Sequence, residues 1–152
     1  MRIRVLRKGK TKQVHLRALE SEYATRIARF HEIVVEDFAP ASKGPRQGML
    51  SAKEERLVEK LEGSVKVLLD PNGREWTSEE FARWLEDQTL RGTREVAFLV
   101  GGPDGFSDAW RGRADFLLAL SRMTLTHEWA PVILLEQIYR GFCILRGLPY
   151  AR

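Results

Sequence analysis

Residues 98–106 read FLVGGPDGF, an apolar run that stops abruptly at two glycines. The continuous apolar residues 96–100 are typical of a strand that is buried on both faces of a sheet. Because glycine carries no Cβ, a ligand can approach the main chain directly after such a strand. Open α/β sheets bind small ligands where their strands end. The stretch therefore predicts a buried strand followed by a candidate pocket.

The rest of the chain alternates strand-like and helix-like patterns. Short β-prone runs predict further strands at residues 3–6, 31–38, 65–69 and 116–120. Helical spacing predicts helices over residues 11–30, 55–62, 108–112 and 131–145, and another that begins at Thr77 or Ser78. This alternation favours one α/β domain over residues 1–152, with a mainly parallel sheet.

Three segments between these elements have clear local signals. Residues 51–54, SAKE, have the form of a capping box, in which a serine hydroxyl and a glutamate carboxylate satisfy free amides at a helix start. Residues 70–73, DPNG, predict a turn that ends the third strand, and we interpret Asp70 as a turn residue. The Pro- and Gly-containing residues 39–48 predict a loop.

Composition allows an RNA partner without requiring one. The chain has 152 residues, 43% of them hydrophobic and 30% charged, and a formal charge of +4. Basic residues cluster near its start, where they favour a phosphate-binding edge and a solvated edge about equally. The cluster comprises Arg2, Arg4, Arg7, Lys8, Lys10 and Lys12.

Several familiar functional classes lack their signals. Neither G-x-G-x-x-G nor G-x-x-x-x-G-K-S/T occurs, so the sequence carries no dinucleotide fingerprint and no P-loop. The three histidines lack the spacing and partners of a metal site, so no metal is expected. Cys143 is expected to be a small buried hydrophobe. No apolar segment is long enough to span a bilayer, and we expect a soluble, cytoplasmic protein.

The chain resembles one enzyme family along nearly its whole length. The resemblance is carried by VLLDPNGREWTSEEFARWL, EVAFLVGGPDGF, LSRMTLTH and LLEQIYRGFCILRGLPY, in this order, together with the basic first strand. These segments are similar to those of the SPOUT-class methyltransferases that modify N3 of a pseudouridine in large-subunit ribosomal RNA. The resemblance implies a parallel α/β sheet with helices on both faces, a C-terminal deep trefoil knot, a homodimer and S-adenosylmethionine as cofactor. It also implies ribosomal RNA as the partner, with the assembled ribosome as the expected substrate.

The resemblance also assigns roles to individual residues. Arg140 is the implied catalytic group, and Tyr150 and Arg152 are implied to bind the nucleotide; a helix ion pair with Glu136 is the alternative reading of Arg140. The residues implied to bind the cofactor follow three strands and are Leu69, Gly101, Gly102, Ser121, Arg122, Met123, Thr124, Leu125 and Thr126.

Two departures from the family pattern leave other functions open. Residues 127–131, HEWAP, stand where the family reads His-Pro-x-x-Arg, and Ala151 replaces a histidine after Pro149-Tyr150. No general base can be named, although His127 is a candidate by residue type. One alternative is therefore a ribosome-binding SPOUT relative that has lost its activity. A flavodoxin-like or receiver-like binding module is another.

Overall fold

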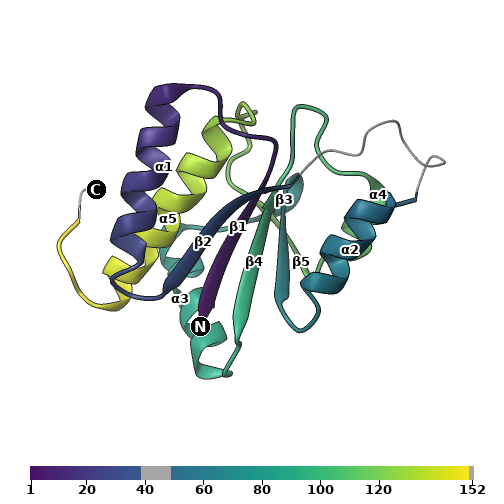
Figure 1. The fold of residues 1–152 in the computed structure, drawn as a ribbon. Coiled ribbons are helices and arrows are strands. Elements are labelled where there is room, and N and C mark those ends of the chain that lie inside the picture. The colour runs from purple at the N-terminus through teal and green to yellow at the C-terminus, as the bar shows by residue number, and fades with distance from the viewer. Residues whose placement is uncertain (39–48, 151–152) are drawn as a thin grey trace.

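The β-prone runs form one five-stranded sheet, and each pair of neighbouring strands in it is parallel (Figure 1). The computed structural model describes residues 1–38 and 49–150, so the loop predicted at residues 39–48 lies outside it. The strands are β1 (Arg2–Lys8), β2 (Glu32–Phe38), β3 (Val65–Glu75), β4 (Glu95–Val100) and β5 (Phe116–Ala119). Their order across the sheet is β2-β1-β4-β3-β5. The predicted strands and the predicted α/β class are confirmed.

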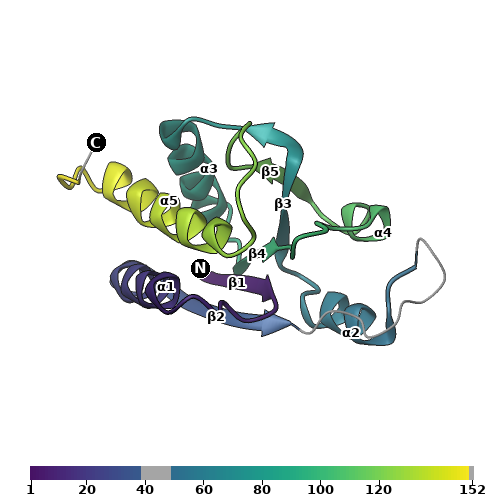
Figure 2. The same cartoon turned by 90° about the horizontal axis from the view of Figure 1, so that it is seen from above.

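Helices cover both faces of this sheet, as expected (Figures 1 and 2). One face carries α1 (Val14–Ile27), α3 (Ser78–Leu90) and α5 (Trp129–Leu145), and the other carries α2 (Ala52–Lys60) and α4 (Asp108–Arg111). Alternate strand residues point to opposite faces, so Phe98 packs in the core beneath α3 and α5 while Leu99 packs toward α2 and α4. None of the helices in the described ranges has the length and apolarity needed to cross a membrane.

Local sequence signals set the helix starts. Ser51 Oγ accepts a hydrogen bond from Glu54 N at 3.2 Å and forms the predicted capping box of α2. Thr77 forms a second capping box with Glu80 and begins α3, which resolves the choice between Thr77 and Ser78. These contacts satisfy main-chain amides that the first helical turn leaves without partners.

The prediction that residues 70–73 end the third strand is wrong. Strand β3 continues to Glu75 and only bulges at this point, because Leu69 and Arg74 both pair with Leu118 of β5. The turn chemistry is nevertheless present, since Asp70 Oδ1 accepts a hydrogen bond from Asn72 N at 2.8 Å. The turn sequence therefore does not end the strand, because β3 pairs with β5 on both sides of it.

The bulge depends on a glycine at position 73. A Cβ there would lie 2.6 Å from the Leu117 carbonyl carbon and 2.7 Å from Leu118 N, both main-chain atoms of β5. Main-chain atoms inside a sheet cannot move aside cheaply, so overpacking at this point strains both strands.

We predict that Gly73→Ala lowers the free energy of unfolding by about 1–3 kcal/mol, measured by urea denaturation. Gly112→Ala is the matched control, because a Cβ there meets nothing closer than 3.5 Å and the glycine has an ordinary negative φ. Equal stability of the two variants would contradict the role assigned to Gly73.

Candidate functional site

The neighbouring strands β4, β3 and β5 lead into a cavity of about 340 Å³. The cavity is lined by residues 69–72 of the β3 bulge, by Val100 at the end of β4 with residues 101–105 after it, and by the segment after β5. The segments expected around a cofactor thus lie together. Seven of the nine residues implied to bind the cofactor line this cavity, namely Leu69, Gly101, Gly102, Ser121, Met123, Thr124 and Leu125.

Arg122 and Thr126 do not line this cavity. The Arg122 side chain is 86% exposed and its Nε lies 3.9 Å from a carboxylate oxygen of Glu75. The main-chain oxygen of Thr126 accepts hydrogen bonds from Trp129 N and Ala130 N, both at 3.1 Å, and so starts α5 two residues before the predicted position. In this single chain, these two residues therefore have contacts of their own outside the cavity.

The two glycines after β4 differ in the space around them. A Cβ at Gly101 would lie 3.1 Å from the Phe106 ring and 3.2 Å from the Gly105 carbonyl carbon, so packing within the loop accounts for this glycine. A Cβ at Gly102 would meet only Lys8, at 3.8 Å. Packing does not explain Gly102, whereas its position on the cavity wall offers a reason for a small residue.

Glu128 ties the end of the cavity-lining segment to the start of α1, a contact that the sequence did not predict. Its Oε1 accepts hydrogen bonds from Gln13 N at 3.1 Å and from Lys12 N. These main-chain hydrogen bonds hold the pKa of the Glu128 carboxyl below its ordinary value. The one feature that could have indicated this contact is that the N-cap residue of α1, Gln13, makes no capping hydrogen bond with its own side chain. A carboxylate from elsewhere in the chain can then cap the helix.

Asp70 also does more than shape the bulge. Only 3% of the residue is exposed, and its Oδ2 accepts a hydrogen bond from Arg111 Nε at 2.6 Å. Burial alone would raise the pKa of the Asp70 carboxyl, but hydrogen bonds from Arg111 and from Asn72 N outweigh burial and hold the pKa below its ordinary value. Both Asp70 and Arg111 line the cavity.

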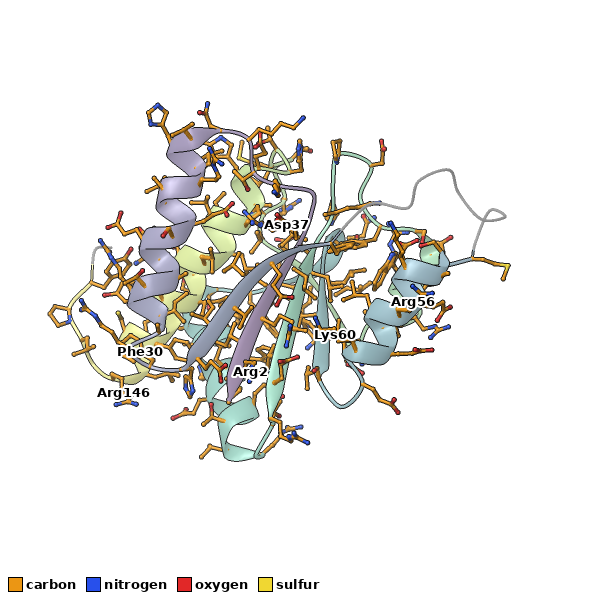
Figure 3. The ribbon with its side chains drawn as sticks, viewed as in Figure 1. Arg2, Phe30, Asp37, Arg56, Lys60 and Arg146 are labelled. Atoms are coloured by element: carbon orange, nitrogen blue, oxygen red, sulfur yellow. The ribbon has the colours of Figure 1, made fainter. Side chains whose placement is uncertain are left out.

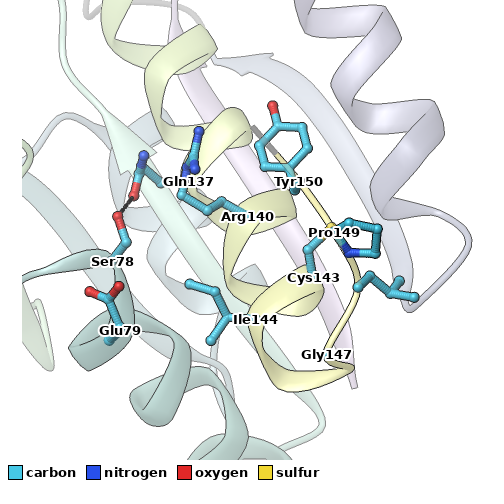
Figure 4. Close-up of a pocket in the computed structure, with 10 residues that line it drawn as sticks. Ser78, Glu79, Gln137, Arg140, Cys143, Ile144, Gly147, Pro149 and Tyr150 are labelled. Carbon is cyan, nitrogen blue, oxygen red and sulfur yellow. Dashed lines mark hydrogen bonds between the residues drawn. The ribbon is translucent and has the colours of Figure 1, made fainter. Parts of the chain in front are cut away.

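A second cavity, of about 1020 Å³, brings Arg140 and Tyr150 together (Figure 4). The Arg140 guanidinium lies 4.7 Å from the centre of the Tyr150 ring, and its Nε donates to Glu136 Oε1 at 3.0 Å. The alternative reading of Arg140 as a helix ion-pair partner is thus realised in this chain. Cys143 lines the same cavity and is buried, as predicted. Arg152 lies outside the described residues.

Tyr150 is held in place by aromatic and hydroxyl contacts. Its hydroxyl lies 3.0 Å from that of Tyr23, and its ring meets the Tyr139 ring edge-on at a centroid distance of 4.8 Å. Burial and the hydrogen bond with Tyr23 raise the pKa of the Tyr150 hydroxyl, so this group stays protonated at neutral pH. The tail is therefore packed against α1 and α5 at this residue.

The two cavities lie toward different ends of α5. Ala130 lines the first cavity and Arg140 the second. Their spacing along the helix corresponds to about 15 Å at a rise of 1.5 Å per residue. One chain therefore does not bring Arg140 into the cavity that contains Gly102.

The arginines of β1 do not supply a free positive edge. Arg4 pairs with Glu36 and Glu95, both at 3.1 Å, and Arg7 pairs with Asp37 at 2.7 Å and with Glu20. Figure 3 shows Arg2 and Asp37 toward opposite ends of the β1–β2 pair. Of the six clustered basic residues, Lys8, Lys10 and Lys12 have ammonium groups with no ion pair within residues 1–38 and 49–150.

Comparison with known proteins gives consistent results over the whole chain. The sequence profile of a family described as "Predicted SPOUT methyltransferase" matches residues 1–151. A protein of Geotalea daltonii named "Ribosomal RNA large subunit methyltransferase H" is 40% identical over 151 residues, which cover 99% of each chain. A protein of the same name from Geobacter sulfurreducens is 41% identical over 152 residues and also covers 99% of each chain.

Solved structures agree on the fold. A probable methylase family protein from Haemophilus influenzae has 13% sequence identity and a TM-score of 0.55, over 99% of this chain and 70% of that chain. A putative methylase family protein from Neisseria gonorrhoeae has 12% identity and a TM-score of 0.52, over 99% of this chain and 94% of that chain. The family profile and the close relatives establish what the fold alone does not: the chain belongs to the SPOUT methyltransferase family, alongside the ribosomal RNA large subunit methyltransferases H.

Proposed function

We propose that this protein transfers a methyl group from S-adenosylmethionine to N3 of a pseudouridine in large-subunit ribosomal RNA, with the assembled ribosome as substrate. The observation that carries the proposal is one cavity lined by the β3 bulge and by the segments that follow β4 and β5, which include most of the residues that the family resemblance assigns to the cofactor. The names of the close relatives support the RNA substrate.

The chemistry of the first cavity suits this cofactor. Leu69, Met123 and Leu125 offer apolar walls for an adenine ring, and main-chain groups of the loops can bond its edge. Asp104 contributes a carboxylate, which complements a positively charged ligand. When bound, the cofactor supplies a methyl group that its positive sulfur has already activated. The chain then contributes mainly alignment, for which a barrier reduction of about 7–11 kcal/mol is available.

Arg140 and Tyr150 are the proposed nucleotide-binding residues. A ring nitrogen such as N3 must lose its proton before it accepts a methyl group, and a nearby guanidinium stabilises the resulting anion. The Arg140 side chain is held by Glu136 and stacks on Tyr150, which presents an ordered cation and an aromatic surface for a base. In this proposal Arg140 stabilises negative charge on the base, and the N3 proton passes to solvent water rather than to Arg140.

A homodimer would reconcile the separation of the two cavities. We propose that a second copy of the chain brings its Arg140 and Tyr150 to the cofactor cavity of the first. Exposed apolar residues on α5 and the following tail favour such a contact, since Trp129, Ile144 and Leu148 are each 40% exposed or more. The family resemblance further supports a C-terminal trefoil knot, with the segment after β5 threaded through a preceding loop.

We predict that Gly102→Val abolishes the binding of S-adenosylmethionine in a calorimetric titration, while the wild-type protein binds in the micromolar range. The added side chain would meet only Lys8 within 4 Å at its Cβ, so thermal unfolding should change little. Gly112→Ala, which does not line the cavity, should bind normally. Unimpaired binding by Gly102→Val would place the cofactor elsewhere.

We predict that Arg140→Ala lowers methyl transfer to ribosomal particles about 100-fold or more, while the dissociation constant for S-adenosylmethionine changes less than about twofold, because Arg140 does not line the cofactor cavity. Transfer of labelled methyl groups and calorimetry measure the two quantities. Arg146→Ala is the control on the same helix end, since Arg146 contacts Phe30 rather than Tyr150.

Wild-type turnover by Arg140→Ala would refute the role of Arg140. A wild-type protein that binds cofactor and ribosomes but transfers no methyl group would instead favour the ribosome-binding relative without activity, a possibility suggested by the departures at residues 127–131 and Ala151.

A further inference from the structure

Arg111 is the one lysine or arginine among the described residues that line the cofactor cavity. It lies at the end of the short helix α4, and its side chain is 37% exposed. The family resemblance assigned this residue no role. A guanidinium on the wall of this cavity needs a physical reason, because a charge without a partner in the ligand would cost desolvation energy when the ligand entered.

The guanidinium of Arg111 is fixed by two carboxylates. Nε donates to the buried Asp70 at 2.6 Å, and one terminal nitrogen, Nη1, donates to Asp108 at 2.7 Å. Arginine has five N–H donors, and these two contacts leave others unused. No further partner for them occurs in the part of the chain that the structure describes. The side chain is therefore oriented and still able to donate to a ligand.

Arg113, two residues after Arg111, is a surface arginine with which the contacts of Arg111 can be compared. It donates to Glu55 at 3.0 Å, its side chain is 48% exposed, and it does not line the cavity. Arg111 differs in both respects, since its partner is a buried carboxylate and its neighbours are cavity residues. The Asp70–Arg111 pair thus holds a cation at the cavity wall.

The charges around the cavity match an amino-acid group. Arg111 can donate paired N–H groups to a ligand carboxylate. Asp104 lines the same cavity and is an exposed carboxylate suited to an ammonium group. Asp70 is already occupied by Arg111 and Asn72. A ligand that carries both a carboxylate and an ammonium group would satisfy the remaining donors and acceptors.

We propose that Arg111 binds the carboxylate of the amino-acid portion of S-adenosylmethionine, and that Asp70 is a positioning residue that holds the guanidinium for this contact. The inference rests on the proposed function and deepens it, since it orients the ligand with its amino-acid end toward α4. The adenine then faces the apolar residues of the other segments.

Two ligands that differ only in the amino-acid portion test this assignment. S-adenosylhomocysteine carries the carboxylate, whereas 5′-methylthioadenosine keeps the adenosine and the sulfur but lacks the amino acid. Arg111→Met should weaken binding of S-adenosylhomocysteine about 10- to 100-fold, the range expected for a charge-assisted hydrogen-bonded contact. Binding of 5′-methylthioadenosine should change less than about threefold. Arg113→Met is the matched control and should bind both ligands normally.

Because Arg111→Met leaves the buried Asp70 without its cation, the double variant Asp70→Asn/Arg111→Met is measured beside it to keep the site uncharged and folded. The same selective loss in both variants supports the proposal. Equal losses for the two ligands, or no loss for either, would overturn it, because Arg111 would then act on the fold alone or not at all. A wild-type protein that binds neither ligand would overturn the proposed function as well.

Discussion

The parallel pairing of β3 between β4 and β5 is the constraint on which the rest of the structure depends. It brings together three segments that are far apart in the sequence and opens one cavity among them. The β3 bulge then turns Asp70 toward Arg111, while Gly73 lets the strand return to β5. The position of α4, the shape of the cavity and the charge on its wall follow from this pairing.

Ion pairs within the chain determine which basic side chains remain available to contact RNA in the proposed function. Arg4 and Arg7 form ion pairs with carboxylates of neighbouring strands and of α1, so they add little positive electrostatic potential at the surface. Burial raises the pKa of Glu20, although hydrogen bonding to Thr11 and the charge of Arg7 oppose this. The modest net charge of +4 supports the proposal of an assembled ribosome as substrate more than it supports tight binding to free RNA.

Local signals such as apolar runs and capping boxes were sufficient to predict the helices and strands, and the glycines after residues 96–100 predicted a pocket there. The remaining cavity residues were predicted from the family resemblance. The sequence misread residues 70–73, since pairing with β5 continued the strand through a sequence that favours a turn. It could not anticipate Glu128 as the cap of α1, or Asp70 as the partner of Arg111, because both contacts join residues that only the fold brings together. Arg140 was assigned from family resemblance, and its distance from the first cavity could not be inferred without the direction of α5.

The most direct measurement is a crystal structure of the protein with S-adenosylhomocysteine. We predict electron density for the ligand among Leu69, Gly102 and Thr124, where the β3 bulge and the segments after β4 and β5 line one cavity. Density in the groove beside Arg140 and Tyr150, or at any other site with the first cavity empty, would contradict this prediction.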